Sequence, residues 1–135
     1  RQEKVNLIAQ DVPDLAIELG EDSGDILVLG WGSTYGASRT AVRELIQDGY
    51  KVSQAHFRYL NPFPKNTGEL LSKFKKVMIP EINNGQLVHM INAQYKVNAQ
   101  GVNKIQGMPF TSKEIKENLI NRLKIVNKMA IKQDE

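Results

Sequence analysis

The sequence lacks cysteine altogether, and its 135 residues include no long apolar run. Without cysteine, the chain can form no disulfide, no cysteine nucleophile and no thiolate site for zinc or an iron–sulfur cluster. No apolar stretch approaches the roughly 20 residues that cross a bilayer, and no signal peptide is visible. We therefore predict a cytoplasmic protein without a membrane partner. Because the first residue is Arg1, we expect a piece of a longer protein.

Positive charges exceed negative charges only slightly. Lys and Arg number 18 and Asp and Glu number 15, which gives a net charge of +3. The densest basic group, Lys73, Lys75 and Lys76, has no aromatic residues interleaved with it. Scattered charges of this kind are typical of solvated surfaces. We predict no nucleic-acid partner.

Residues for catalysis or metal binding are also scarce. The two histidines, His56 and His89, have no carboxylate at metal-ligand spacing. Glu21 and Asp22 fall in a surface loop, while Glu81 stands alone at the end of a strand. We expect Glu81 to anchor the following turn, and a buried polar role is the alternative. The sequence predicts no catalytic residue and no metal site.

The chain is organised around residues 25–36, an apolar run followed by a glycine-rich turn and the start of a helix. An apolar run of this length bounded by glycine indicates a strand that is buried on both faces. Ser33 and Thr34 are expected to cap the helix. Free N–H groups at such a helix start can hold an anion.

This turn does not match the known nucleotide or hydrolase motifs. Gly30, Gly32 and Gly36 are spaced with one residue more than the dinucleotide fingerprint G-x-G-x-x-G. No acid to bind a ribose lies in residues 57–61, and no Gly-Lys-Ser/Thr follows. Ser33 is not in the G-x-S-x-G context of a nucleophile. The glycines are therefore expected to shape a tight turn and to bind no cofactor.

The rest of the chain alternates between strand and helix patterns. Strands are expected at residues 15–18, 25–29, 51–60, 76–82 and 102–106. Helices are expected at 36–47 and after the turns at 66, 83–86 and 111. This order predicts a three-layer α/β/α fold with a mostly parallel sheet. The first strand has no helix before the second, so we expect it to run antiparallel at an edge.

Each helix is expected to bury one stripe of apolar residues. The first stripe comprises Ala37, Ala41, Val42, Leu45 and Ile46. The stripe after residues 83–86 comprises Leu87, Val88, Met90, Ile91 and Tyr95. The short helix after Asn66 carries Leu70, Leu71 and Phe74. The final helix carries Ile115, Leu119, Ile120, Leu123 and Val126, and residues 128–135 are expected to fray.

Several single residues give local predictions. Asn66 with Glu69, and Thr111 with Glu114, have the spacing of capping pairs. Pro80 lacks a backbone donor, so the regular ladder of its strand is expected to end there.

Two turns are candidates for a ligand or partner. Each follows a buried strand and opens a helix, and such turns meet in a crevice if the strand order reverses between them. The candidate residues are Gly32, Ser33, Thr34, Asn83, Asn84, Gly85 and Gln86. Their hydroxyl and amide groups suit either an anion or the surface of a neighbouring domain.

Four motifs in order carry a resemblance to a known family: GWGSTYG at 30–36, YLNPFP at 59–64, NGQL at 84–87 and GMPF at 107–110. Together they resemble the C-terminal domain of the α subunit of 2-oxoacid:ferredoxin oxidoreductases, most of all the 2-oxoglutarate type. Residues 1–13 are similar to the linker of that family. Met108 is a departure, because related sequences often carry a basic residue there.

The resemblance implies a transketolase C-terminal-like fold, with a five-stranded mixed sheet in the order 1-3-2-4-5 and strand 1 antiparallel. It implies a holoenzyme that oxidatively decarboxylates a 2-oxoacid with thiamine diphosphate, Mg²⁺, coenzyme A and iron–sulfur clusters, and that reduces ferredoxin. The family holds thiamine and cluster ligands in other domains or in the β subunit.

We therefore expect a non-catalytic scaffold and interface domain that binds none of these cofactors itself. Its expected parts are a linker from an upstream domain (1–14), the domain (15–127) and a polar tail (128–135). Its expected partners are the upstream domains, the β subunit and, through the holoenzyme, ferredoxin. The alternative is a small regulatory α/β domain that binds an anion or a nucleotide.

Overall fold

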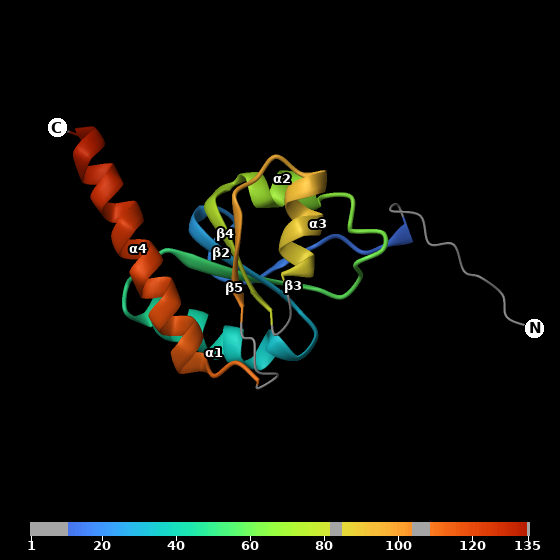
Figure 1. Ribbon diagram of the computed structural model, residues 1–135, viewed down its shortest axis with the longest axis horizontal. Coiled ribbons are helices and arrows are strands. Elements are labelled where there is room, and N and C mark those ends of the chain that lie inside the picture. Colours follow the sequence, from blue (N-terminus) through green and yellow to red (C-terminus); the bar gives the residue numbers. More distant parts are fainter. Residues whose placement is uncertain (1–10, 82–84, 104–108, 135) are drawn as a thin grey trace, which may run out of the picture.

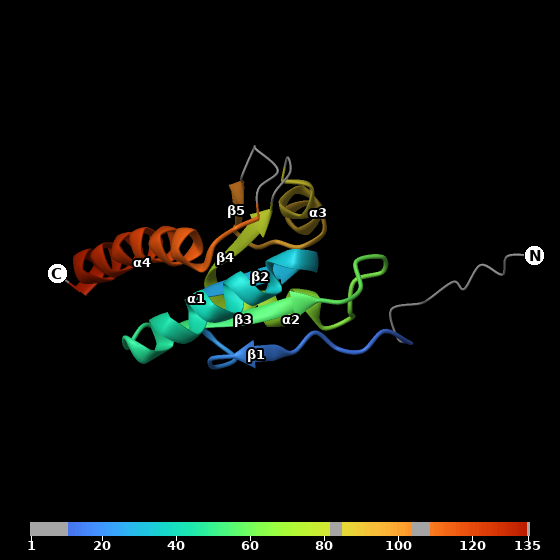
Figure 2. The same ribbon diagram turned by 90° about the horizontal axis from the view of Figure 1, so that it is seen from below.

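A computed structural model describes residues 11–81, 85–103 and 109–134. Its strands are β1 (Ile17–Leu19), β2 (Gly24–Trp31), β3 (Val52–Phe57), β4 (Phe74–Glu81) and β5 (Ala99–Asn103). They form one sheet in the order β1-β3-β2-β4-β5, in which β1 is antiparallel to β3 and the other pairs are parallel. Figure 2 shows β1 and β5 at opposite edges of this sheet. The expected order and the antiparallel edge are confirmed.

Four helices cover the two faces of the sheet. They are α1 (Tyr35–Gln47), α2 (Thr67–Ser72), α3 (Gln86–Gln94) and α4 (Ser112–Asp134), and a 3₁₀ turn, η2 (Gly32–Thr34), precedes α1. Apolar residues of α1 and α4 pack on one face, while those of α2 and α3 pack on the other. Figure 1 shows these two pairs on opposite sides of the strands. The fold is the predicted three-layer α/β/α arrangement.

The central strand β2 supplies both halves of the core. Leu27 and Leu29 belong to the cluster under α2 and α3, and Ile26 and Val28 belong to the cluster under α1 and α4. All four are fully buried. Side chains of a strand alternate between its faces, so a continuous apolar run fits a strand that is covered twice.

The helical stripes are confirmed for the described side chains except at their margins, and Val126 lies outside these described side chains. In α1, Ala41, Val42 and Leu45 are buried, whereas Ile46 is 37% exposed. In the stripe of α3, Met90 is 43% exposed. A surface helix buries a stripe only somewhat more than about 100° wide, so a residue at the margin of the pattern is left in solvent. The expected burial of Ile46 and Met90 was therefore wrong.

Two element boundaries differ from the prediction. Phe74, assigned by its sequence to a helix, is the first residue of β4. The last strand begins at Ala99, three residues before the expected start. The amide of Asn92 accepts from the N–H of Ala99 at 3.1 Å and donates to its carbonyl at 3.0 Å. This contact determines where β5 begins, and it cannot be predicted from the hydrophobicity pattern of the sequence.

Pro80 does not end the strand that contains it. Pairing of β4 with β2 runs to the Val28–Met78 pair, whereas pairing with β5 continues through Pro80 to Glu81. The expected end of the ladder was wrong on the β5 side. Proline lacks only the donor, so the strand continues along its other edge.

The final helix begins with the predicted capping box. The N–H of Thr111 donates to Glu114 Oε1 at 3.0 Å, and the N–H of Glu114 donates to Thr111 Oγ1 at 3.1 Å. The helix then continues through residues 128–134, which we expected to fray. The division at 1–14, 15–127 and 128–135 stays a prediction, and residues 1–10 lie outside the described part. No helix among the described residues is long and apolar enough to cross a membrane.

Candidate functional site

The two candidate turns lie at the same edge of the sheet. Because β2 and β4 are parallel neighbours, the turns that follow them meet above their carboxyl ends. A crevice of about 240 Å³ lies between the turns. It is lined by Trp31, Gly32, Ser33, Thr34, Pro80, Glu81 and Gln86. The crevice therefore lies where the strand order reverses between β2 and β4, as the sequence predicted.

The structure brings together four of the seven candidate residues, namely Gly32, Ser33, Thr34 and Gln86. Gly85 is the buried residue before Gln86, and its φ of 73° suits glycine. Asn83 and Asn84 lie outside the described residues. Binding of an anion or a domain by this set stays a prediction. Trp31 and Pro80 also line the crevice, although the sequence did not indicate either as a site residue.

Neither Ser33 nor Thr34 caps α1, contrary to the prediction. Thr34 occupies the N-cap position, but its hydroxyl donates backwards to the carbonyl of Trp31 at 3.3 Å. The 3₁₀ turn places Thr34 in the helical region, whereas a capping side chain needs an extended backbone there. As a result α1 begins at Tyr35, and Ser33 remains exposed.

The glycines of this turn have the structural role that we expected. A Cβ on Gly30 would lie 2.9 Å from Thr34 Oγ1 and 3.2 Å from His56 Nδ1. Gly32 has a φ of +66°, which glycine adopts without strain. Close packing and backbone direction therefore account for both residues without a nucleotide.

Glu81 anchors the turn after its strand, as predicted. The residue is buried, and its Oε1 accepts from the N–H of Leu87 at 2.9 Å while Oε2 accepts from the N–H of Val88 at 3.4 Å. The carboxylate thus accepts from two of the free donors in the first turn of α3. An anion in the crevice would meet this negative charge instead of an open helix N-terminus. The α3 side of the crevice therefore suits a neutral or hydrogen-bond-donating group better than an anion.

A second polar cluster lies between β1, β3 and α1. Glu18 Oε1 accepts from the hydroxyl of Tyr35 at 3.0 Å and from the guanidinium of Arg58 at 3.3 Å. Arg58 lies 5.6 Å from the centroid of the Tyr35 ring, and Arg39 donates to the hydroxyl of Tyr35 at 3.4 Å. The ring therefore stacks with one cation and shares its hydroxyl with the other. Sequence reasoning missed this cluster, because its members come from three separate elements.

His56 is packed against this cluster. It is 8% exposed, and its ring meets that of Tyr35 edge-on at 4.9 Å. Burial, helped by the charge of Arg58, lowers the pKa of His56, while Glu18 and the backbone of Gly32 oppose that effect. The described part of the chain contains no group of three residues that could hold a metal ion. His56 is therefore a packed histidine.

Comparison with known proteins gives the family. Residues 24–117 match the pyruvate:ferredoxin oxidoreductase core domain II family. The chain belongs to this family. The matched region runs from β2 into α4, so it includes every residue that lines the crevice, and β1 precedes it.

Relatives of the chain are subunits of 2-oxoacid oxidoreductases. It is 44% identical over 115 residues to the 2-oxoglutarate oxidoreductase subunit KorA of Mycobacterium tuberculosis, which covers 85% of this chain and 17% of that protein. It is 29% identical over 120 residues to the alpha subunit of 2-oxoacid:ferredoxin oxidoreductase 2 of Aeropyrum pernix, covering 85% and 19%. The chain thus spans about a fifth of these relatives.

Solved structures support the same assignment. The 2-oxoglutarate:ferredoxin oxidoreductase of Magnetococcus marinus, solved with 2-oxoglutarate, coenzyme A and succinyl-CoA bound, matches at a TM-score of 0.78 and 30% identity. The match covers 84% of this chain and 20% of that one. A split-gene transketolase matches at a TM-score of 0.59 and 14% identity, over 76% and 39% of the two chains, which shows the fold alone. The expected transketolase-like architecture is confirmed.

Proposed function

We propose that this chain is the C-terminal scaffold and interface domain of the α subunit of a 2-oxoacid:ferredoxin oxidoreductase that uses 2-oxoglutarate. The observation that carries the proposal is the 44% identity to KorA over 85% of the chain. The fold match to the Magnetococcus marinus enzyme points to the same substrate class. The parent enzyme would oxidatively decarboxylate the 2-oxoacid to an acyl-CoA and pass the electrons to ferredoxin.

The cofactors of the holoenzyme are assigned to other parts of it. Thiamine diphosphate, Mg²⁺, coenzyme A and the iron–sulfur clusters need ligands that fit poorly here. The chain has no cysteine for a cluster, and the buried carboxylate in its crevice is engaged with two backbone N–H groups. This carboxylate also disfavours the phosphates of coenzyme A. The domain accordingly carries no chemical step.

The proposed role of the domain is to pack against other parts of the enzyme and hold them in place. The proposed partners are the other domains of the same subunit, the β subunit and, through the holoenzyme, ferredoxin, all in the cytoplasm. A core closed on both faces of the sheet gives the rigidity that such a domain needs.

Turnover by the complete enzyme tests the proposal. The full-length subunit is co-expressed with its β subunit, and ferredoxin reduction is measured with coenzyme A and either 2-oxoglutarate or pyruvate. We expect turnover with 2-oxoglutarate and none from the 135-residue chain alone. Preference for pyruvate would reject the substrate, and inactivity with every 2-oxoacid would reject the enzyme class.

The crevice itself supports a second candidate, a regulatory domain that binds an anion or a nucleotide. Exposed Ser33 and Gln86 side chains line its 240 Å³ opening. Thermal unfolding with phosphate, coenzyme A and nucleotides separates the two functions. A dose-dependent rise in Tm supports binding, because a ligand of the folded state adds to its stability. An unchanged Tm favours the scaffold.

A further inference from the structure

On β2 and β3, the two rows of apolar residues that face α2 and α3 continue past the end of the buried core. On β2, Leu27 and Leu29 are buried on the face covered by α2 and α3, whereas Trp31, the next residue on that face, is 41% exposed. On the neighbouring strand, Phe57 is buried on the same face and pairs in register with Trp31. Tyr59, two residues further on, is again 41% exposed. Both rows therefore leave a large aromatic side chain in solvent.

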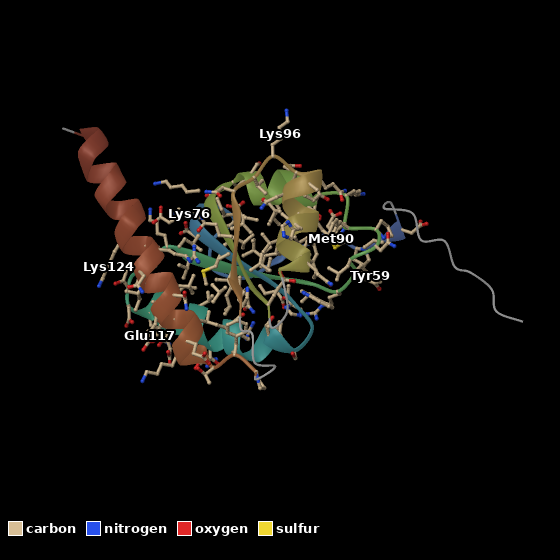
Figure 3. All side chains as sticks on the ribbon, viewed as in Figure 1. Tyr59, Lys76, Met90, Lys96, Glu117 and Lys124 are labelled. Carbon is tan, nitrogen blue, oxygen red and sulfur yellow. The ribbon has the colours of Figure 1, made fainter. Side chains whose placement is uncertain are left out.

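A third exposed apolar residue lies on α3, which packs on the same face of the sheet. Met90 of α3 is 43% exposed, and Figure 3 shows Tyr59 and Met90 on the side away from α1 and α4. We name Trp31, Tyr59 and Met90 the carboxyl-end face, since Trp31 is the last residue of β2, Tyr59 follows β3, and Met90 lies in the helix after β4.

Each residue of the carboxyl-end face borders a hollow. Trp31 lines the crevice of about 240 Å³, Tyr59 lines a cavity of about 330 Å³, and Met90 lines one of about 410 Å³. Pro64 lines both of the latter cavities, so the two lie next to each other. Exposed apolar side chains set beside hollows are the pattern of a surface that receives side chains of a partner.

The amino-terminal end of the strands has one such residue, beside a smaller hollow. Among the described residues, the fourth large hydrophobic that is exposed is Ile46, at 37%. It lies near the end of α1 and borders a smaller hollow of about 100 Å³ with Tyr50 and Lys51, which precede β3. The apolar surface is thus concentrated where the strands end, and Ile46 provides a matched reference site.

Charge at the rim indicates the chemistry of the occupant. Arg58 beside Tyr59 is already paired with Glu18 at 3.3 Å, and the three residues of the carboxyl-end face carry no charge. Asp14, Lys65 and Glu81 also line the three hollows, so charges of both signs are present and a partner of one charge sign is not favoured. The surface suits apolar and aromatic side chains.

We propose that the carboxyl-end face docks onto apolar side chains of another domain of the same parent subunit. This inference rests on the proposed function. Relatives of the chain are about five times as long, so most of the parent subunit lies outside domain II and could supply the partner surface. Three partly exposed side chains provide much less surface area than the roughly 800 Å² that each partner buries in a typical stable complex. A domain on the same chain docks at high effective concentration and needs less area. A neighbour in the same subunit is therefore the occupant that this small patch fits.

Photocrosslinking in the intact enzyme tests the proposal. The full-length subunit is co-expressed with its β subunit and carries p-benzoylphenylalanine in place of Tyr59, Met90 or, as the control, Ile46. All three positions are exposed, so the substitutions leave the core intact. Irradiated complexes are digested, and the linked peptides are identified by mass spectrometry. Mixing isotope-labelled and unlabelled subunits separates links within one subunit from links between two copies.

We expect the sites at Tyr59 and Met90 to link to peptides of the same subunit outside this domain, with a yield several times that of the Ile46 site. Links to the β subunit or to a second copy, the absence of links, or an equal yield at Ile46 would each overturn the proposal. Ferredoxin reduction by the unsubstituted complex is measured separately. An active enzyme without the links rejects only the docking surface, and links in an enzyme inactive with every 2-oxoacid reject only the function.

Discussion

Glu81 Oε1 accepts a hydrogen bond from the backbone N–H of Leu87 at 2.9 Å. The carboxylate at the end of one strand therefore caps the helix that follows it, six residues further along the chain. The same contact places a fixed negative charge in the wall of the crevice. One side chain thus explains how α3 is held and why the crevice is a poor site for an anion.

Removing this cap should destabilise the domain. We expect Glu81→Ala to lower the free energy of unfolding by roughly 1–3 kcal/mol, because buried N–H groups lose their acceptor. Glu81→Gln keeps the acceptor for the N–H of Leu87 but loses the charge and the longer bond from Val88, so its loss should be smaller, about 1 kcal/mol. Urea unfolding measures both. The exposed Glu117→Gln is the control, expected within about 0.5 kcal/mol of wild type, and an equal effect of all three would contradict the capping role.

Asn66 ties the edge strand to the rest of the domain. Its side chain accepts from the N–H of Leu15 and donates to the carbonyl of Leu15, each at 2.8 Å. We expect Asn66→Ala to cost roughly 1–3 kcal/mol and to speed hydrogen exchange at the Leu15 amide. Asn66→Asp keeps the acceptor but sets a carboxylate against a carbonyl, so it should not restore stability. Asn121→Ala, at an exposed helical position, should cause no loss.

Two glycines should respond in opposite directions to alanine. A Cβ on Gly20 would lie 2.4 Å from the carbonyl oxygen of Val52, and the φ of Gly20 is +87°. We expect Gly20→Ala to lower stability by about 1–3 kcal/mol, because a backbone atom must shift. Gly36 lies in α1 with nothing within 4 Å of its added Cβ, so Gly36→Ala should raise stability by about 0.4–1 kcal/mol. Thermal unfolding compares the two, and changes of the same sign would refute this account.

Burial of His56 should make stability depend on pH. Its pKa in the folded chain is lowered from 6.5, chiefly by burial, so the unfolded state binds the proton first as the pH falls. The free energy of unfolding should therefore be highest above pH 6.5 and decrease below it towards the lowered pKa of His56. Urea unfolding at a series of pH values measures this slope. His56→Gln should lose part of the slope, and an unchanged slope would show that other groups cause it.

Local patterns in the sequence were sufficient for the frame of the fold. The apolar run in β2 predicted a strand buried twice, and the Thr111–Glu114 spacing predicted the start of α4. Both succeed because they depend on residues close together in the chain. The strand order came from the resemblance of four motifs to a family, and no periodicity contained it.

Local patterns failed where a distant partner competed. Asn66 has the spacing of a helix cap with Glu69, yet its amide binds Leu15, 51 residues away. Thr34 follows the rules for a cap, but a 3₁₀ turn directs its hydroxyl backwards. In each case a contact or backbone angle set by the folded chain outweighed the local preference.

The sequence by itself determined the succession of strands and helices, the two-sided burial of β2 and the position of the two turns, because hydrophobic period and turn chemistry are local properties. Tertiary structure decided that Glu81 closes the α3 side of the crevice, that His56 is buried beside Tyr35, and that Trp31 remains in solvent. Burial and hydrogen bonding depend on which elements become neighbours. That neighbourhood exists only once the sheet has formed.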